Sequence, residues 1–288
     1  MKFHLNYIPK PSPFKIDLSN QILLAGSCFS DNIGNLLATH QFNANINPEG
    51  LFFNPESLCD SLNAIIANKP LDENLILKRD DRYVSYLHHS RVSGATKADL
   101  ISQFRNKRER THEFLKSADL LILTFGTAFV YCLADSKQVV ANCHKQPAAL
   151  FTKRILTTAE ITALYSQLLI KLRPFNKDLK ILFTISPVKY LKDGVEENVL
   201  SKAILRVAVN DIVQANENCY YFPAYELVNE DLRDYRFFKE DLAHPNDLAI
   251  QYVWDKFADS YFAEDTKKEL REIHRKQLQL AHRPLNKQ

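Results

Sequence analysis

The stretch QILLAGSCFSDNI, residues 21–33, decides the fold that we expect for this chain. It begins with an apolar run, stops at Gly26, and passes through Ser27 and Cys28 into a helical pattern. A strand that leads through a short turn into a helix is the repeating unit of open α/β proteins, whose ligands bind beyond the carboxyl ends of the strands. We therefore expect Ser27 and Cys28 to lie at the mouth of a sheet, where a side chain on such a turn can be oriented for chemistry.

Four further runs predict the other strands of this sheet. They are the alternating FNANI at 42–46 and the apolar runs DLLILT at 119–124, KILFTI at 180–185 and CYYF at 219–222. Helical patterns separate them, and parallel strands need such crossovers, which cover both faces of a sheet. The sequence predicts a three-layer α/β/α fold with a flavodoxin-like, doubly wound parallel sheet in the order 2-1-3-4-5 and small insertions.

The segments around these strands are predicted as follows. Residues 130–143 read as a hairpin inserted after the third strand. Residues 196–216 read as a helix whose buried stripe, at helical spacing, is expected to contain Leu200, Ile204, Val207 and Ile212.

We expect three segments along the chain. Residues 1–20 contain three closely spaced prolines and read as an extended lead-in over the surface, because proline lacks the N–H that a central strand needs. Residues 21–262 form the α/β domain, and residues 263–288 form a charged helical tail.

Composition limits the classes of function. The chain has 288 residues, 45% of them hydrophobic, and a net charge of +3, which equals the excess of seven basic over four acidic residues in 264–288. The rest is close to neutral, so we expect no nucleic-acid surface. An apolar leader and a membrane-spanning run are not seen, which favours a cytoplasmic protein with no membrane partner. The five cysteines are an odd number without a CxxC pair, which favours free thiols, no metal site and no cofactor.

One loop near the end of the chain carries residues suited to proton transfer. Asp241 and His244 stand three residues apart in DLAHPN, between the last strand and the last helix of the domain. A carboxylate at this spacing can hold the imidazole in one tautomer and make it more basic. Together with Cys28 at the same edge of the sheet, the pair would form a nucleophile, a base and an orienting acid. The alternative is that Asp241 and His244 form only a turn and a helix cap.

Several motifs, found in this order, resemble the GSCFA family, a relative of the SGNH (GDSL-like) hydrolases. The resemblance runs over about residues 21–262. The motifs are GSCFS at 26–30, NPEGLFFNP at 47–55, GTAFVY at 126–131, NCHK at 142–145, SPV at 186–188 and DLAHP at 241–245.

The resemblance implies roles for particular residues. Cys28 takes the place of the serine nucleophile in Gly-Asp-Ser-Leu, and Asp241 and His244 match the Asp-x-x-His pair. Gly50 is a loose counterpart of the glycine in the oxyanion hole. Ser27 is the alternative nucleophile, and its other interpretation is a helix cap. We prefer Cys28, because a thiol at a helix N-terminus beside a histidine can ionise near neutral pH. The alternative interpretation of Cys28 is a small buried hydrophobic residue, which is the usual role of a single cysteine after an apolar strand.

The third block departs from the SGNH pattern. Where Gly-x-Asn-Asp is expected, the block in this chain begins with Gly126 and has Ala128 in the place of the oxyanion asparagine. Losing one such donor typically costs about 2.7–4 kcal/mol of transition-state stabilisation. Asn142 and His144 are the candidates to replace it.

These observations favour an esterase or acyltransferase that acts on an acyl ester of a small molecule or carbohydrate through a Cys/His/Asp site. The alternative is a non-catalytic, ligand-binding module of the same fold, which the missing asparagine favours. A metal-dependent hydrolase has little support from ligand spacing. The sequence makes no prediction of the oligomeric state.

Overall fold

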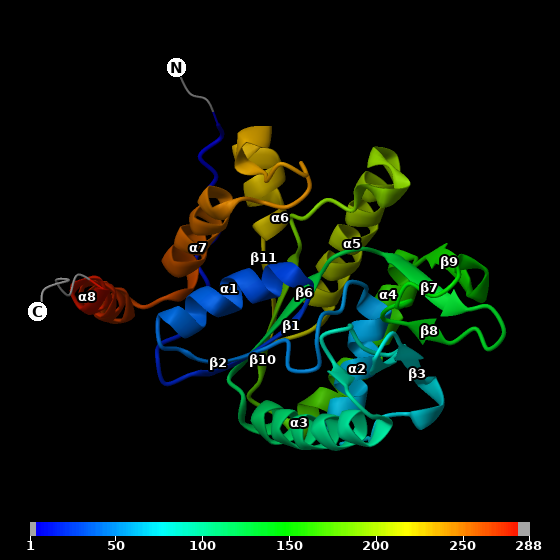
Figure 1. Cartoon of the computed structure of the whole chain (residues 1–288). Coiled ribbons are helices and arrows are strands. Elements are labelled where there is room, and N and C mark those ends of the chain that lie inside the picture. The colour runs from blue at the N-terminus through cyan, green and yellow to red at the C-terminus, as the bar shows by residue number, and fades with distance from the viewer. Residues whose placement is uncertain (1–3, 282–288) are drawn as a thin grey trace, which may run out of the picture.

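A five-stranded parallel sheet forms the centre of the protein, for which a computed structural model describes residues 4–281 (Figure 1). Its order is β11-β10-β6-β1-β2, which confirms the predicted 2-1-3-4-5 arrangement. The strands are β1 (Gln21–Gly26), β2 (Asn43–Ile46), β6 (Leu120–Phe125), β10 (Lys180–Ile185) and β11 (Cys219–Phe222). Every residue of β6 is buried, as its continuous apolar sequence requires of a central strand.

Helices cover both faces of the sheet, which gives the three layers (Figure 1). The helices are α1 (Cys28–Thr39), α2 (Pro55–Ile66), α3 (Lys97–Ser117), α4 (Thr158–Phe175), α5 (Val195–Ala215), the short α6 (Ala224–Glu226), α7 (Asp247–Tyr261) and α8 (Glu264–Ala281). Helices α2 to α5 contribute to the hydrophobic cluster on one face, and α1, α7 and α8 to the cluster on the other. Short 3-10 turns lie between them at η1 (Glu73–Leu75), η2 (Ala148–Leu150), η3 (Leu191–Asp193) and η5 (Tyr235–Phe237), and a π-helical segment, η4 (Leu227–Leu232), follows α6.

Two small antiparallel sheets are inserted into this framework. The first contains β3 (Ile76–Arg79), β4 (Arg82–Ser85) and β5 (Ser93–Gly94), and the second contains β7 (Phe129–Leu133), β8 (Val139–Val140) and β9 (Phe151–Ile155). The hairpin predicted within residues 130–143 is formed by β7 and β8. The sequence did not predict β9, which pairs with β7 from beyond a long loop.

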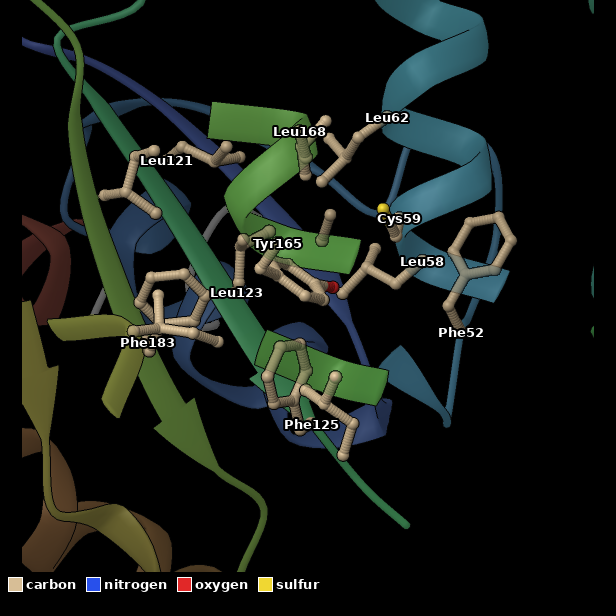
Figure 2. Close-up of a cluster of buried hydrophobic side chains, with 14 of the residues drawn as sticks. Phe52, Leu58, Cys59, Leu62, Leu121, Leu123, Phe125, Tyr165, Leu168 and Phe183 are labelled. Atoms are coloured by element: carbon tan, nitrogen blue, oxygen red, sulfur yellow. The ribbon is translucent and has the colours of Figure 1, made fainter. Parts of the chain in front are cut away.

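The larger core lies between the sheet and α2 to α5 (Figure 2). At its centre Tyr165 of α4 is fully buried and packs edge-on against Phe125 of β6 and Phe183 of β10, with ring centroids 5.0 Å and 5.7 Å away. Its hydroxyl donates to the carbonyl oxygen of Pro55 at 3.1 Å, which satisfies a polar group that burial would otherwise leave unpaired.

The buried stripe of α5 differs from the prediction. Leu200 and Val207 are 54% and 51% exposed, whereas Ser201 and Lys202 are buried. Ile212 is fully buried and Ile204 is partly buried against the core, as predicted. In the first half of α5, Ser201 and Lys202 bond to backbone groups that follow β6 and β10, so polar side chains take the inward positions there. In the second half the buried positions are apolar, but they are Leu205, Ala208 and Val209 in place of Val207.

The two ends of the chain are described in part. Of the predicted tail, residues 264–281 form α8, and residues 282–288 lie outside the described range, as do residues 1–3 of the lead-in. None of the helices within residues 4–281 combines the length and the apolar character that crossing a membrane requires.

Candidate active site

The turn after β1 depends on a glycine. Gly26 has a φ of 139°, and a Cβ added there would lie 2.2 Å from the carbonyl oxygen of Thr124 in β6. A side chain is excluded, because β1 and β6 approach so closely at this point. The N–H of Gly26 donates to Asn47 Oδ1 at 2.9 Å, which ties the turn to the loop after β2.

Ser27 is fully buried and stands at the N-cap of α1. Its hydroxyl accepts a hydrogen bond of 3.4 Å from the N–H of Phe29, and its own N–H donates to Thr124 at 3.1 Å. This position favours the capping interpretation over the alternative nucleophile, because a fully buried hydroxyl is not accessible to a substrate.

Cys28 is the first residue of α1, and its side chain is partly exposed at the carboxyl edge of the sheet. Burial raises the pKa of the Cys28 thiol above its ordinary value, and the carboxylate of Asp31 raises it further. The N–H of Cys28 itself and two nearby cations lower the pKa by less. The expectation of a thiol that ionises near neutral pH is therefore wrong for this structure, because desolvation outweighs the helix N-terminus. The thiol needs a base to take its proton.

Asp31 is fixed beside Cys28 by residues that the sequence did not mark as functional. Its Oδ2 pairs with Arg91 Nη1 at 2.5 Å, and its Oδ1 accepts from Asn47 Nδ2 at 2.6 Å. Arg91 belongs to the loop between β4 and β5, so the first inserted sheet brings a cation to the edge where Cys28 lies. No local sequence signal marks this cation, because the pairing spans sixty residues.

Asp241 and His244 form a hydrogen-bonded pair in the loop before α7. Asp241 Oδ2 lies 2.6 Å from His244 Nδ1, while Asp241 Oδ1 accepts from the N–H groups of Ala243 and His244, both at 2.9 Å. These two backbone bonds, and then the imidazole, lower the pKa of Asp241 to about 2. The carboxylate is therefore charged at neutral pH, and the bond at Nδ1 leaves Nε2 as the ring nitrogen that can exchange a proton with a ligand.

The structure brings Cys28 and this pair to the same edge of the sheet without joining them. Within residues 4–281 no hydrogen bond links Cys28 to His244. The segment after β10 contacts the loop that carries the pair, because Lys189 N–H donates to the carbonyl of Ala243 at 3.0 Å. The hydroxyl of Tyr190, in the same segment, lies 2.9 Å from the place of a Cβ added to Gly126. The candidate triad thus consists of a formed acid and base pair and a separate thiol.

The amide of Gly50, the loose counterpart of the oxyanion-hole glycine, and that of Gly126, the first residue of the third block, are already bonded. Gly126 N–H donates to the carbonyl of Phe53 at 2.8 Å, and Gly50 N–H donates to that of Asn47 at 2.9 Å. The N–H of Cys28 differs, because the first amide of a helix has no carbonyl one turn earlier to accept from it. It is therefore a backbone donor available to the carbonyl oxygen of an acyl group bonded to the Cys28 sulfur, where the oxyanion would form.

Asn142 and His144 are held at the end of β4, where Asn142 N–H donates to the carbonyl of Tyr86 at 3.3 Å. Asn142 Oδ1 accepts from the N–H of His144 at 2.7 Å, and His144 Nε2 lies 2.8 Å from the carbonyl oxygen of Ser85. His144 is buried, which lowers the pKa of its imidazole. These contacts hold the two side chains against the first inserted sheet rather than at the turn that contains Ala128.

Lys202 is the most unusual side chain at this edge. It is 2% exposed, and its Nζ donates to the carbonyl oxygens of Gly126 at 2.6 Å and Ser186 at 2.7 Å. Burial lowers its pKa to about 7, against a smaller opposing effect of Cys28. The amine thus links the backbone that follows β6 to the backbone that follows β10, close enough to Cys28 for the two groups to influence each other's pKa.

Ser201 and Asn198 continue this contact along α5. Ser201 Oγ accepts from the N–H of Ala128 at 2.7 Å, and Asn198 Oδ1 accepts from the N–H of Tyr190 at 2.8 Å. With Lys202 they stand at positions i, i+3 and i+4 of one helix face. This polar stripe, at helical spacing in the sequence, marks the inward face of the first half of α5, where an apolar stripe was predicted.

A metal centre has no candidate ligands in the described part of the chain. Among residues 4–281 there is no group of three or more His, Cys, Asp or Glu side chains placed to hold a metal ion. Within the same range all five cysteines are free thiols.

Comparison with known proteins gives one family and several distant structures. The profile of the GSCFA family matches residues 21–257. A search of curated proteins found no match.

Three solved structures represent the structural similarity. A family 2 carbohydrate esterase with a carbohydrate binding domain from Corynascus thermopiles (Myceliophthora fergusii) has a TM-score of 0.44 and 13% identity, over 90% of this chain and 69% of that chain. The acetyl xylan esterase Est2A of the rumen bacterium Butyrivibrio proteoclasticus has a TM-score of 0.36 and 13% identity, over 86% of this chain and 64% of that chain. A family 3 carbohydrate esterase of Clostridium thermocellum has a TM-score of 0.37 and 11% identity, over 88% of this chain and 98% of that chain.

Proposed function

This chain belongs to the GSCFA family, and from this premise we propose that it is an esterase or acyltransferase that forms an acyl-thioester on Cys28. The observation that supports the proposal most is the pair of Asp241 and His244, joined at 2.6 Å at the same edge of the sheet where Cys28 begins α1. A carboxylate, an imidazole with a free Nε2 and a thiol are the groups that nucleophilic acyl transfer needs.

In the first half of the reaction His244 acts as a general base and then as a general acid. Its Nε2 takes the thiol proton while the sulfur of Cys28 forms a bond to the carbonyl carbon of the ester. The bond from that carbon to the alcohol oxygen then breaks, and the imidazolium returns the proton to the leaving alcohol. Asp241 keeps its charge throughout and stabilises the imidazolium.

In the second half an incoming hydroxyl replaces the thiol. His244 takes a proton from water or from an acceptor alcohol, whose oxygen attacks the thioester carbon, and the carbon–sulfur bond breaks as Cys28 regains its proton. Water as the acceptor gives an esterase, and an alcohol gives an acyltransferase. Because the pKa of Cys28 is raised, the resting enzyme holds a thiol, so His244 is needed from the start.

We propose a small-molecule or carbohydrate acyl ester as the substrate. The purified chain is incubated with activated acetyl, butyryl and octanoyl esters and with acetylated xylose, and its intact mass is followed. We expect one acyl group on Cys28 and release of the alcohol; both are lost in Cys28→Ala and kept in the matched variant Cys143→Ala, which changes the other partly exposed cysteine. An adduct that persists in Cys28→Ala, or no adduct and no turnover with any ester, refutes the proposal.

A non-catalytic binding module is the second candidate. Its support is that the amides of Gly50 and Gly126 are already bonded and that Ala128 replaces the expected asparagine. This alternative predicts saturable binding of an acylated sugar without release of acid or alcohol, and identical binding by wild type and Cys28→Ala.

A further inference from the structure

The candidate active site lacks a side-chain donor for the oxyanion. Attack of Cys28 on an ester places negative charge on the carbonyl oxygen, which hydrogen-bond donors fixed in advance stabilise best. The N–H of Cys28 is available, but the amides of Gly50 and Gly126 are bonded to backbone carbonyls. Ala128, in the place of the asparagine of the SGNH pattern, has no donor in its side chain. Acyl transfer here therefore needs a donor from another part of the chain.

The pairing of β1 with β6 places Gly126 at the same edge of the sheet as Cys28. Gly26 pairs with Thr124, and Cys28 and Gly126 each stand two residues farther along the chain. Because β1 and β6 are neighbouring parallel strands, both residues follow carboxyl ends that lie side by side. A group held against Gly126 is therefore at the edge where an ester would meet Cys28.

The hydroxyl of Tyr190 is held against Gly126. A Cβ added to Gly126 would lie 2.9 Å from this hydroxyl and 3.0 Å from the carbonyl oxygen of Phe53. Gly126 is not among the glycines with a positive φ, so space and not backbone conformation excludes a side chain here. The third block thus begins with a glycine because Tyr190 and Phe53 fill the place of a side chain.

This hydroxyl is unpaired and accessible. Among residues 4–281 no hydrogen bond joins it to another residue. Solvent reaches it, whereas the unpaired side-chain atoms buried in this range are His88 Nδ1, His144 Nδ1 and Thr184 Oγ1. Burial of Tyr190 raises the pKa of its hydroxyl well above the ordinary value, and negative charge at Cys28 raises it further. The hydroxyl therefore keeps its proton, as a donor must, and is close enough to Cys28 to respond to its charge.

Neighbouring groups fix the position of Tyr190. Its N–H donates to Asn198 Oδ1 at 2.8 Å, and its ring stands edge-on to that of Phe53 with the centroids 5.7 Å apart. Lys202 Nζ lies 5.5 Å from the centroid of the Tyr190 ring. A donor that is held in place before the substrate binds needs no reorganisation when the charge develops.

We propose that the hydroxyl of Tyr190 is the side-chain donor of the oxyanion hole, in the role that an asparagine has in the SGNH pattern. As the Cys28 sulfur bonds to the carbonyl carbon, one electron pair of the C=O bond moves onto the oxygen, which accepts hydrogen bonds from the Tyr190 hydroxyl and the Cys28 N–H. The pair returns when the bond to the leaving alcohol breaks, and Tyr190 keeps its proton throughout. This inference rests on the proposed acyl transfer and adds a catalytic residue to that site.

The first test compares Tyr190→Phe with wild type in two reactions of the same thiol. Acylation of Cys28 by an activated acetyl ester passes through an oxyanion, whereas alkylation by iodoacetamide displaces iodide without forming one. We expect Tyr190→Phe to slow single-turnover acylation at least about tenfold and to alkylate at a rate within about twofold of wild type. The matched control is Tyr225→Phe, which removes the hydroxyl from another ring near Lys202 Nζ, at 5.9 Å, and should acylate at the wild-type rate.

A second measurement separates this inference from the proposed function. Trifluoroacetone adds to a thiol without losing a leaving group, and its ¹⁹F resonance reports the hemithioketal formed on Cys28 of the full chain. We expect an adduct that is lost in Cys28→Ala, weakened at least about tenfold in Tyr190→Phe and unchanged in Tyr225→Phe. If no ester acylates wild type but this pattern is found, the proposed function fails and the role of Tyr190 stands.

Three outcomes overturn the inference. The first is that Tyr190→Phe weakens both acylation and the ketone adduct by less than about tenfold. The second is that acylation and alkylation fall by the same factor, because Tyr190 would then position the thiol and not bind the oxyanion. The third is that wild type forms neither an acyl-thioester nor a ketone adduct on Cys28.

Discussion

Asp241 Oδ2 lies 2.6 Å from His244 Nδ1, and this bond decides which ring nitrogen of the histidine can serve a substrate. We expect Asp241→Asn to lower the rate of Cys28 acylation by at least about tenfold, because an amide no longer stabilises the imidazolium and can favour the wrong tautomer. The matched control is Glu240→Gln, which removes the adjacent exposed carboxylate. Single-turnover acylation, followed by intact mass, is the measurement. Equal rates for both variants would place the pair outside the reaction.

The reactivity of Cys28 should rise steeply with pH and respond to Asp31. Burial, followed by the Asp31 carboxylate, raises the pKa of this thiol, so little thiolate is present at neutral pH. Asp31→Asn removes the negative charge, lowers the thiol pKa, and should speed alkylation at pH 7.5 by about threefold to tenfold. Iodoacetamide labelling with peptide mass analysis separates Cys28 from Cys143, which serves as the internal control. A rate for Cys28 that stays the same in Asp31→Asn would show that this carboxylate has no influence on the thiol.

The order of the sheet was predictable, because buried parallel strands carry continuous apolar runs and their crossovers follow in sequence. The strand β9 was not predictable, since its sequence FTKRI has two consecutive basic residues in place of an apolar run. The turn at Cys28 and the pair of Asp241 and His244 were visible as short motifs. Their electrostatic surroundings were not visible in the sequence, because Arg91 and Lys202 reach this edge only through the tertiary fold. Helical periodicity also does not reveal which face of α5 meets polar backbone groups.

Gly26 and Gly194 offer a matched test of the turn that follows β1. Both have a positive φ, 139° and 109°, but a Cβ at Gly26 would lie 2.2 Å from the backbone oxygen of Thr124, whereas one at Gly194 meets only the flexible carboxylate of Glu197 at 2.9 Å. We expect Gly194→Ala to lower the free energy of unfolding by about 1 kcal/mol and Gly26→Ala by more than about 3 kcal/mol, since only the latter must move a strand. Urea unfolding measures both. Equal losses would mean that β1 and β6 can separate at low cost.

Lys202 should make the stability of the protein depend on pH above neutrality. Burial lowers its pKa to about 7 in the folded chain, below the ordinary value of 10.5 that it regains on unfolding. Between these two pH values the unfolded chain holds a proton that the folded chain lacks, so the free energy of unfolding rises with pH. A neutral amine has two N–H groups, and the structure supplies two acceptors, Gly126 and Ser186.

The measurement compares Lys202→Met with wild type in urea at pH 7.5 and pH 9, with Lys116→Met on α3 as the control for loss of an exposed amine. Wild type and the control should both gain about 1 kcal/mol per pH unit more than Lys202→Met, because the other titrating groups are common to all three chains and cancel in the difference. If the three curves run parallel, Lys202 stays charged in the folded protein. Its ammonium would then carry an unpaired buried charge at the ends of β6 and β10, and would be positioned to stabilise a Cys28 thiolate instead.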